Sequence, residues 1–331
     1  MLRRILIGLG AALAVGVVGA GAAPMPLHAT TSIRFPYADS SYAALGSGAG
    51  SVWAFVPSNG VLYRYDDRSG RLVARIRLGP TPSSAVVANE PEGRVVVAGG
   101  FVWVADQASQ RLIRVSPGSN RVVAQVRLAD PYDVALTSGA VWVPEFGPYR
   151  VARLDPATNR VMSSIAAVGP TSAAIGDGSL WIVAHRSDQV LRVDPKTGMT
   201  LATVSLRRGS GPEVARFGDG ALWVSTPGTN SLTRIDPATG KVAVTIPLPS
   251  GAQGGLLAVG GGSVWIENFV GVYRIDPHLN AITGKLSVSH PGQCGASPLI
   301  DAPCAGPIAY AGGSLWVYDP VGKRILRVPS A

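Results

Sequence analysis

All seven tryptophans of this 331-residue chain belong to one repeated motif, which limits the possible fold more than any other feature. They are separated by 50, 39, 39, 42, 42 and 51 residues and are Trp53, Trp103, Trp142, Trp181, Trp223, Trp265 and Trp316. A glycine precedes each tryptophan by three residues. An arginine follows eleven residues later in six repeats and nine residues later in the sixth, at Arg64, Arg114, Arg153, Arg192, Arg234, Arg274 and Arg327. A period of about 40 residues predicts one supersecondary unit used seven times.

Each unit is expected to contain four short strands. In the fifth unit, residues 214–217, 221–225, 231–235 and 241–248 are rich in β-branched residues and alternate in polarity. The last two strands are joined by Asp236-Pro-Ala-Thr-Gly240, a turn whose closing residue adopts a positive φ. Glycine and asparagine enter that region most easily, and they close six of these turns, at Gly70, Asn120, Asn159, Gly198, Gly240 and Asn280. The pattern predicts an all-β chain, a seven-bladed β-propeller of four-stranded antiparallel blades.

The last repeat ends after its third strand, which predicts how the ring closes. Residues 31–35 resemble a fourth strand and precede the first full repeat. We expect them to pair with residues 325–328, because this pairing removes two exposed sheet edges. The repeated tryptophan is expected to pack against the neighbouring blade, and the repeated arginine to lie over the indole or pair with a turn aspartate. Residues 23–331 are therefore predicted to form a single propeller domain.

The N-terminus predicts export. Two arginines, an apolar stretch from Ile5 to Gly19 and Ala20-Gly21-Ala22 indicate a signal peptide over residues 1–22. The alternative is a retained membrane anchor, because this stretch is nearly long enough to span a bilayer. We expect cleavage, a secreted or periplasmic, cell-envelope location, and no transmembrane segment in the mature chain.

The net charge and the two cysteines limit which ligands and bonds are expected. Without Arg3 and Arg4, the formal net charge of +9 becomes +7. Much of this charge recurs once per repeat, and no basic cluster is interleaved with aromatic residues, so we do not expect nucleic-acid binding. Cys294 and Cys304 lie close together in a Pro/Gly-rich stretch, which in an exported protein favours a disulfide over a metal site.

Function is expected where the repeats differ, on the face formed by the turns between second and third strands and by the connections between blades. Two connections, 80–97 and 289–308, are enlarged. Polar and aromatic residues on this face are the candidate ligand contacts: Asp130, Tyr132, Asp133, Glu145, Arg186 and Asn268.

A catalytic alternative depends on few residues. His185 is the candidate general base, and Glu267 with His290 are candidate metal ligands, a combination suited to proton abstraction and elimination. A turn histidine and a solvated carboxylate are the simpler interpretation of the same residues. The sequence contains no nucleophile elbow, zinc-protease helix, phosphate loop or calcium loop.

Several repeats resemble a known group of bacterial propellers. Residues 176–182 (Gly-Asp-Gly-Ser-Leu-Trp-Ile) and 234–240 (Arg-Ile-Asp-Pro-Ala-Thr-Gly) are similar to YVTN-type and virginiamycin B lyase-like repeats, as are residues 141–147. The resemblance covers nearly the whole mature chain. It implies a seven-bladed ring and, for the lyases, opening of a cyclic depsipeptide by elimination with a histidine base and a divalent metal held by glutamate. By position it implies His185 as base, with Glu267 and His290 near the metal.

Two hypotheses follow. The favoured one is an exported binding module, a monomer that captures a protein, peptide or glycan on its loop-rich face without a cofactor; the acids beside Tyr132 would attract a polar or cationic partner. The alternative is a metal-assisted carbon–oxygen lyase or hydrolase that uses His185 and Mg²⁺ or Mn²⁺.

Overall fold

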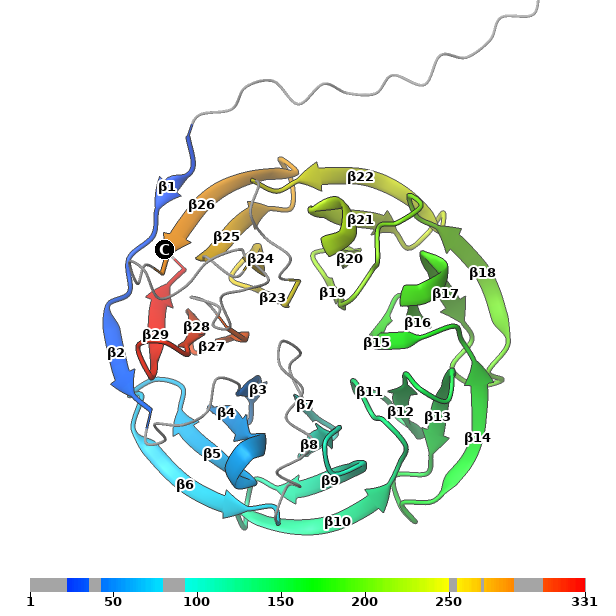
Figure 1. The fold of residues 1–331 in the computed structure, drawn as a ribbon, viewed down its shortest axis with the longest axis horizontal. Helices are drawn as coiled ribbons and strands as arrows, with labels where there is room; N and C mark the ends of the chain where they lie inside the picture. Colours follow the sequence, from blue (N-terminus) through cyan, green and yellow to red (C-terminus); the bar gives the residue numbers. More distant parts are fainter. Residues whose placement is uncertain are drawn as a thin grey trace, which may run out of the picture.

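The computed structural model describes residues 23–35, 43–79, 93–249, 255–268, 271–288 and 306–330, which form seven β-sheets arranged as a ring (Figure 1). In six blades four antiparallel strands follow sequence order from the centre to the rim, and in blade 7 the rim strand comes from the N-terminus, as the repeat predicts. No helix among the described residues is long and apolar enough to cross a membrane.

The strands of the first four blades have the following bounds. Blade 1 consists of β3 (Ala44–Gly48), β4 (Ser51–Val56), β5 (Val61–Asp66) and β6 (Leu72–Arg77). Blade 2 consists of β7 (Gly93–Ala98), β8 (Phe101–Asp106), β9 (Arg111–Ser116) and β10 (Arg121–Arg127). Blade 3 consists of β11 (Ala135–Thr137), β12 (Ala140–Glu145), β13 (Arg150–Leu154) and β14 (Val161–Ala166). Blade 4 consists of β15 (Pro170–Gly176), β16 (Ser179–Ala184), β17 (Gln189–Val193) and β18 (Thr200–Ser205).

The remaining blades follow the same plan. Blade 5 consists of β19 (Ala215–Gly218), β20 (Ala221–Thr226), β21 (Ser231–Asp236) and β22 (Lys241–Pro247). Blade 6 consists of β23 (Leu257–Gly260), β24 (Ser263–Asn268), β25 (Gly271–Asp276) and β26 (Ala281–Ser287). Blade 7 combines β27 (Ile308–Ala311), β28 (Ser314–Asp319) and β29 (Arg324–Pro329) with β2 (Thr31–Arg34). Three short 3₁₀ turns are η1 (Pro57–Asn59), η3 (His185–Ser187) and η4 (Pro227–Thr229).

The N-terminal segment closes the ring. Strand β2 pairs antiparallel with β29, Thr31 opposite Arg327 and Arg34 opposite Arg324, which confirms the predicted closure. The preceding strand β1 (Met25–Pro26) adds in parallel to the outer edge of β26 in blade 6, a pairing that the sequence did not indicate. The described N-terminal segment thus crosses two blades before it enters the first. The predicted bounds of the first enlarged connection, 80–97, were too wide, because Gly93–Ala98 is the inner strand of blade 2. Residues 80–92 and 289–305 lie outside the described part of the chain.

The repeated tryptophans form the interfaces between blades. Trp53 packs among residues of blade 2 such as Val104 and Ile113, and Trp316 packs against blade 1. The other five tryptophans each join the core cluster of the following blade in the same way. Six indole N–H groups donate to the carbonyl oxygen five residues earlier, at 3.1 to 3.3 Å. These six indoles therefore bury apolar area and keep their one polar group satisfied, whereas Trp142 Nε1 has no hydrogen-bond partner among the described residues.

The repeated arginine lies directly across from its tryptophan in all seven blades. Blade 6 keeps this register although its offset is nine residues, because the turn between the two strands is two residues shorter. In the other six blades the guanidinium lies 4.9 to 5.7 Å from the indole centroid, as predicted. Some arginines also reach the next blade: Arg64 Nη1 donates to the Pro117 carbonyl at 2.6 Å, and Arg114 Nη1 donates to that of Pro156 at 2.6 Å.

Candidate functional site

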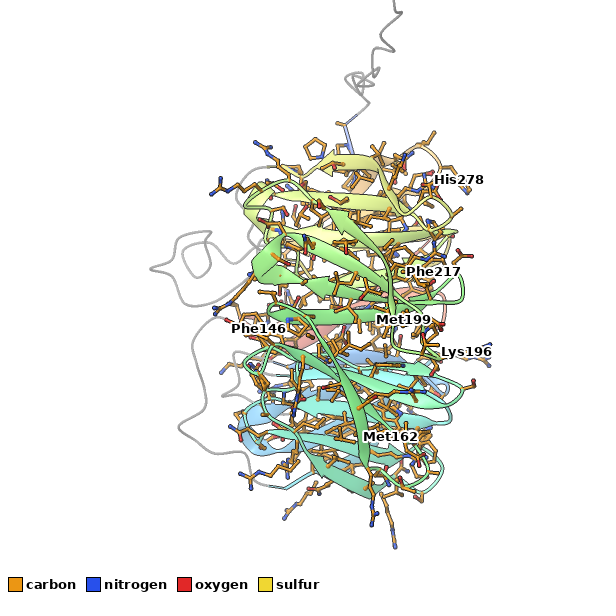
Figure 2. The ribbon with its side chains drawn as sticks, turned by 90° about the vertical axis from the view of Figure 1, so that its right-hand side faces the viewer. Phe146, Met162, Lys196, Met199, Phe217 and His278 are labelled. Carbon is orange, nitrogen blue, oxygen red and sulfur yellow. The ribbon has the colours of Figure 1, made fainter. Side chains whose placement is uncertain are left out.

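The two faces of the ring are unlike. The turns that follow the third strands lie on one face, and their closing residues all have positive φ, from 51° at Asn280 to 76° at Gly198, as predicted. The turns between second and third strands and the connections between blades lie on the other, loop-rich face. Figure 2 shows Phe146 at the edge of the disc opposite to Lys196 and His278.

The turns on the loop-rich face share one backbone geometry in six blades. The residue seven positions after the tryptophan has a φ between 47° and 63°, and its N–H bonds to the carbonyl three residues earlier. These residues are Gly60, Gln110, Tyr149, Asp188, Asn230 and Lys323. Because the backbone is constant, the side chains on these turns vary without altering the ring.

Three of these turns are closed by an ion pair between a buried acid and an arginine whose side chain is 15 to 43% exposed. Asp106 with Arg111, Glu145 with Arg150 and Asp319 with Arg324 are cross-strand partners whose charged atoms are 2.9, 2.6 and 2.7 Å apart. All three carboxylates are fully buried. The hydrogen bond that Arg150 donates to Glu145 raises the pKa of Arg150. Glu145 was predicted as a ligand contact; the structure places its carboxylate inside the blade.

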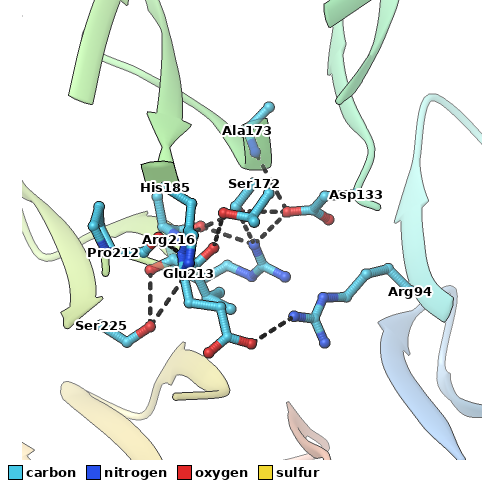
Figure 3. Close-up of polar contacts among 12 residues, drawn as sticks. Arg94, Asp133, Ser172, Ala173, His185, Pro212, Glu213, Arg216 and Ser225 are labelled. Atoms are coloured by element: carbon cyan, nitrogen blue, oxygen red, sulfur yellow. Dashed lines mark hydrogen bonds and ion pairs between the residues drawn. The ribbon is translucent and has the colours of Figure 1, made fainter. Parts of the chain in front are cut away.

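Asp133 is also buried, at a joint between three blades (Figure 3). Its Oδ2 accepts from Ser172 Oγ at 2.6 Å in blade 4 and from Arg216 Nη1 at 3.1 Å in blade 5. Its Oδ1 accepts from the Val134 N–H at 2.9 Å. The Asp133 charge is thus compensated within the protein and helps to fix the inner strands.

Asp130 connects two neighbouring turns. Its Oδ1 accepts from Gln107 Nε2 at 2.6 Å and its Oδ2 from the Gly147 N–H at 2.9 Å. The backbone of Asp130 has a φ of 59°, and its carbonyl oxygen accepts from the Phe146 N–H. The three acids expected to line the wall of the site therefore each have partners within the protein.

Aromatic side chains and one guanidinium form the surface beside these acids. We call Tyr132, Phe146, Tyr149 and Arg186 the aromatic ledge. The rings of Tyr132 and Phe146 have centroids 5.2 Å apart, and the Arg186 guanidinium lies 5.0 Å from the Phe146 ring. Arg186 Nη1 donates to the Tyr149 hydroxyl at 2.7 Å. Arg186 and Tyr149 are exposed, Tyr149 by 41% of its surface.

His185 begins η3 at the inner side of the aromatic ledge. Its ring lies 6.2 Å from that of Phe146, and its Nδ1 is 3.0 Å from the Pro212 carbonyl oxygen. A carbonyl oxygen only accepts, so Nδ1 carries the proton and Nε2 is the accepting nitrogen in the neutral ring. Pro212 is followed by Glu213 and by Val214, and Val214 lines the central cleft described below.

The ring axis holds a small cleft lined by inner-strand residues of five blades. Arg94 and Arg216 are its charged members; the others are Ala44, Leu45, Val214, Leu256, Leu257, Pro307 and Ile308. The Arg94 guanidinium lies 4.0 Å from Glu213 (Figure 3). Burial lowers the pKa of Arg94, although the charges of Asp133 and Glu213 oppose this effect.

Glu267 interacts electrostatically with Arg94 and Glu213. It is 2% exposed, and its Oε1 has no hydrogen-bond partner among the described residues. Burial and the negative charge of Glu213 raise its pKa well above the ordinary value, while the Leu256 backbone contact and Arg94 act in the opposite direction. His185 and Glu267 thus both border the Pro212–Glu213 segment, from blades 4 and 6.

The other predicted residues are placed only in part. Asn268 is fully buried opposite Gly271, and neither amide atom has a partner in the described chain. His290, Cys294 and Cys304 lie outside the described residues, so their roles stay predictions. Within the ranges that the structure describes, no three His, Cys, Asp or Glu side chains form a group that could hold a metal ion.

Sequence reasoning missed Arg94, Ser172, Arg216, Phe146 and Tyr149. A signal existed for the last two, because Phe146-Gly-Pro-Tyr149 is the one loop-rich-face turn of this type with aromatic residues. No comparable signal marked the inner-strand residues, whose partners come from other blades.

Comparison with known proteins adds the following. A family model described as the outer membrane protein assembly factor BamB matches residues 186–284, and no curated protein sequence matches significantly. A streptogramin B lyase structure superposes with a TM-score of 0.73 and 18% identity, covering 90% of this chain and 96% of that one. Virginiamycin B lyase from Staphylococcus aureus gives 0.72 and 16%, covering 91% and 99%, as does its catalytically inactive variant with quinupristin. These similarities establish the fold. The resemblance to virginiamycin B lyase-like propellers noted in the sequence is thus a resemblance of architecture.

Proposed function

We propose that this propeller is an exported binding module that captures its partner on the loop-rich face, at the aromatic ledge. The observation that carries the proposal is the group Tyr132, Phe146, Tyr149 and Arg186, in which rings and a guanidinium hold one another in place at the surface. Side chains that are already held in place lose little conformational entropy when a ligand binds. Tyrosine and arginine are also enriched among the residues that contribute most to binding at protein interfaces.

The variability of the turns supports this location. Six turns share a closing residue with a positive φ, and of these six only the turn of blade 3 carries Phe, Tyr or Trp residues. Aromatic side chains that do not fill a core are retained at a cost to solubility. A role at the surface therefore explains them better than a role in ring stability.

The test is a binding screen with the mature exported protein against glycan and peptide arrays. The variant Phe146→Ala/Tyr149→Ala removes both rings, and Leu279→Ala, which truncates a side chain 69% exposed on the opposite face, is the matched control. We expect at least one ligand class whose binding falls by tenfold or more in the double variant only. Equal binding by both variants and the parent would refute the proposal.

Export is part of the proposal. It is supported by the composition of residues 1–22 and by partial similarity to a protein described as an outer membrane assembly factor. Expression of the full chain in a bacterial host, followed by N-terminal sequencing of the periplasmic fraction, tests it. A mature start near Ala23 is expected; an intact start in the membrane fraction would favour the retained anchor.

A second candidate is the metal-assisted lyase. The observation that favours it is Glu267, a buried carboxyl beside Arg94 and Glu213 with an oxygen that has no hydrogen-bond partner in the described ranges, in a ring that superposes on lyases. The nearby Arg94 cation opposes a divalent ion at this carboxyl, and the described residues supply no third ligand. Calorimetric titration with Mg²⁺ and Mn²⁺ tests the candidate: stoichiometric binding lost in His185→Ala/Glu267→Ala would support it, and binding unaffected by these changes would exclude this pair as the site.

A further inference from the structure

We infer that the ligand of the aromatic ledge is an acidic saccharide, whose carboxylate is received by Arg186 and whose sugar ring lies against Phe146 and Tyr149. The inference rests on the proposed function and adds the chemical class of the ligand. It reverses the expectation from the sequence, in which the acids of this wall would attract a cationic partner.

The first step is the charge that remains at the surface. Glu145 is paired with Arg150 and Asp133 with Arg216, and both carboxylates are fully buried. Arg186 is exposed and has no carboxylate partner among the described residues. Asp130, beside Phe146, is held by Gln107 and the Gly147 N–H and not by Arg186. A ligand that approaches the aromatic ledge therefore meets a guanidinium that pairs with no carboxylate of the described chain, which favours anions.

The second step is the orientation of that guanidinium. Nη1 is held by the Tyr149 hydroxyl at 2.7 Å, and the group lies over the rings of Phe146 and Tyr149, at 5.0 and 5.6 Å. At Gly169, with a φ of 61°, a Cβ would lie 2.8 Å from Arg186 Cγ, so only glycine leaves room for the side chain. These contacts leave Nε and Nη2 to donate in parallel to the two oxygens of a carboxylate.

The third step is Tyr149 itself, which has a φ of 56°. The same turn position carries Gly, Gln, Asp, Asn and Lys in the other five blades of this geometry. A bulky aromatic residue is strained in this region, and such strain is retained where a side chain is needed in a particular place. Here the turn directs the phenol to Arg186, so the strained backbone of Tyr149 helps to orient the guanidinium.

The neighbouring loop adds positive charge. Asp188 accepts hydrogen bonds from the Gly209 N–H at 2.7 Å and the Gly211 N–H at 2.8 Å. Burial opposes ionisation of Asp188, but these hydrogen bonds hold its pKa below the ordinary value. The fixed loop carries the exposed Arg207 and Arg208 on the blade 5 side of η3. An acidic chain longer than one sugar therefore finds further cations beyond Arg186.

A saccharide fits this surface better than a peptide. Peptides are commonly bound by strand addition or in a groove, whereas the aromatic ledge stands on turns whose backbone N–H groups already donate within the turn or to the preceding inter-blade connection. The half-exposed Phe146 ring and the exposed Tyr149 ring, with the guanidinium over one side of them, suit the apolar face of a pyranose that carries a carboxylate at its edge.

The experiment compares an oligosaccharide of uronic acids with its methyl ester, which has the same shape and no charge, and with a sugar phosphate. Binding is measured by calorimetry for the parent, Arg186→Gln and Phe146→Ala. Arg68→Gln, which removes one exposed charge from a turn on the opposite face, is the matched control. We expect the acid to bind at least tenfold more tightly than the ester, and Arg186→Gln, but not Arg68→Gln, to abolish that difference. Gly169→Ala should weaken the acid in the same direction without any change of charge.

The outcomes separate this inference from the proposed function. If acid and ester bind equally and Phe146→Ala weakens both, the ledge is a binding site but the inference about charge is wrong. If the sugar phosphate or an acidic peptide binds through Arg186 while the uronate does not, the saccharide carboxylate is wrong as the ligand class. If ligands bind and no ledge variant affects them, the proposed function fails as well.

Discussion

Blades 2, 3 and 7 close the turn on the loop-rich face with buried charges, whereas blades 1, 4 and 5 close the same turn without them. The residue three positions after the tryptophan is Asp106, Glu145 or Asp319 in the first group and faces an arginine. In the second group it is Val56, Ala184 or Thr226, facing Val61, Gln189 or Ser231. The closing residue of the turn has a positive φ in both groups, but only the turns of the second group are 3₁₀ turns, η1, η3 and η4.

This comparison shows that the acid–arginine pair is not required for the positive φ that closes the turn. A positive φ seven residues after the tryptophan and one backbone hydrogen bond are common to both groups, so they define the turn. The acid–arginine pair and the uncharged pair are then two ways to fill the space beneath the turn. Charged and uncharged fillings are close in net stability when each is complete, because desolvation offsets much of the attraction between buried ions.

The largest effect is expected when a pair is left incomplete. Arg111→Ala leaves the fully buried Asp106 without its cation and should lower the free energy of unfolding by about 3 kcal/mol. Gln189→Ala, the same position in blade 4, should change it by less than about 0.5 kcal/mol. Urea unfolding at constant m-value measures both.

The replacement of the whole pair sharpens the comparison. Asp106→Val/Arg111→Val gives blade 2 the residues that blade 1 has, and should be within about 1 kcal/mol of the parent. A double variant as unstable as Arg111→Ala would show that the ion pair itself, rather than its completeness, stabilises the turn.

Blade 6 belongs to neither group and gives the next prediction. The pKa of Glu267 is raised by burial and by Glu213, so the folded protein keeps a proton that the unfolded chain releases above pH 4.5. Stability is therefore complete below that pH and falls as pH rises through the raised pKa. Glu267→Gln should be insensitive to pH in this window and more stable than the parent at pH 8, by less than the loss in Arg111→Ala.

Glu145→Gln is the control for this prediction. It removes a buried charge that is paired with Arg150, and should lower stability at pH 8 instead of raising it. Thermal unfolding from pH 4 to pH 9 distinguishes the two. Parallel curves for Glu267→Gln and the parent would show that the folded and unfolded states bind protons equally at this residue.

Much of the fold was predictable because seven copies of one motif indicate the same positions of strands and turns. The tryptophan, the arginine across from it and the glycine or asparagine that closes the outer turn each recur at a constant position, and all were found where the repeat placed them. Even the shorter offset in blade 6 follows, because a turn shortened by two residues keeps Trp265 opposite Arg274.

The same reasoning could have removed one candidate site residue and not another. An acid and an arginine five residues apart recur in blades 2, 3 and 7, so the repetition marks Glu145 as part of the scaffold. Asp133 is different, because its partner Arg216 is 83 residues away and two blades on. Nothing in the local sequence shows that this carboxylate is buried, since the contact exists only once the ring has closed.

The uncharged turns should depend on weaker bonds. In blade 5, Thr226 Oγ1 lies 2.8 Å from both the carbonyl oxygen and the hydroxyl of Ser231, and both residues are buried. Thr226→Val keeps the shape and removes the hydroxyl, so it should cost about 1 kcal/mol. Thr229→Val, at the less buried edge of the same group, should cost less in the same urea experiment. A loss as large as that of Arg111→Ala would remove the distinction between the two groups of blades.

The smallest effect is expected at Tyr149 and has the opposite sign. Asparagine adopts a positive φ more easily than tyrosine, so Tyr149→Asn should relieve strain and raise the free energy of unfolding by about 0.5 kcal/mol, after loss of the contact with Arg186. Gln110→Asn, at the same position in blade 2, should stabilise less, because a glutamine side chain is less bulky there. Thermal unfolding compares the two, and the binding assay on the same samples should show ligand affinity lost only for Tyr149→Asn. A protein that is both more stable and unable to bind would indicate that blade 3 keeps a strained turn for recognition, whereas a destabilised Tyr149→Asn would place the tyrosine with the structural pairs of its own group of blades.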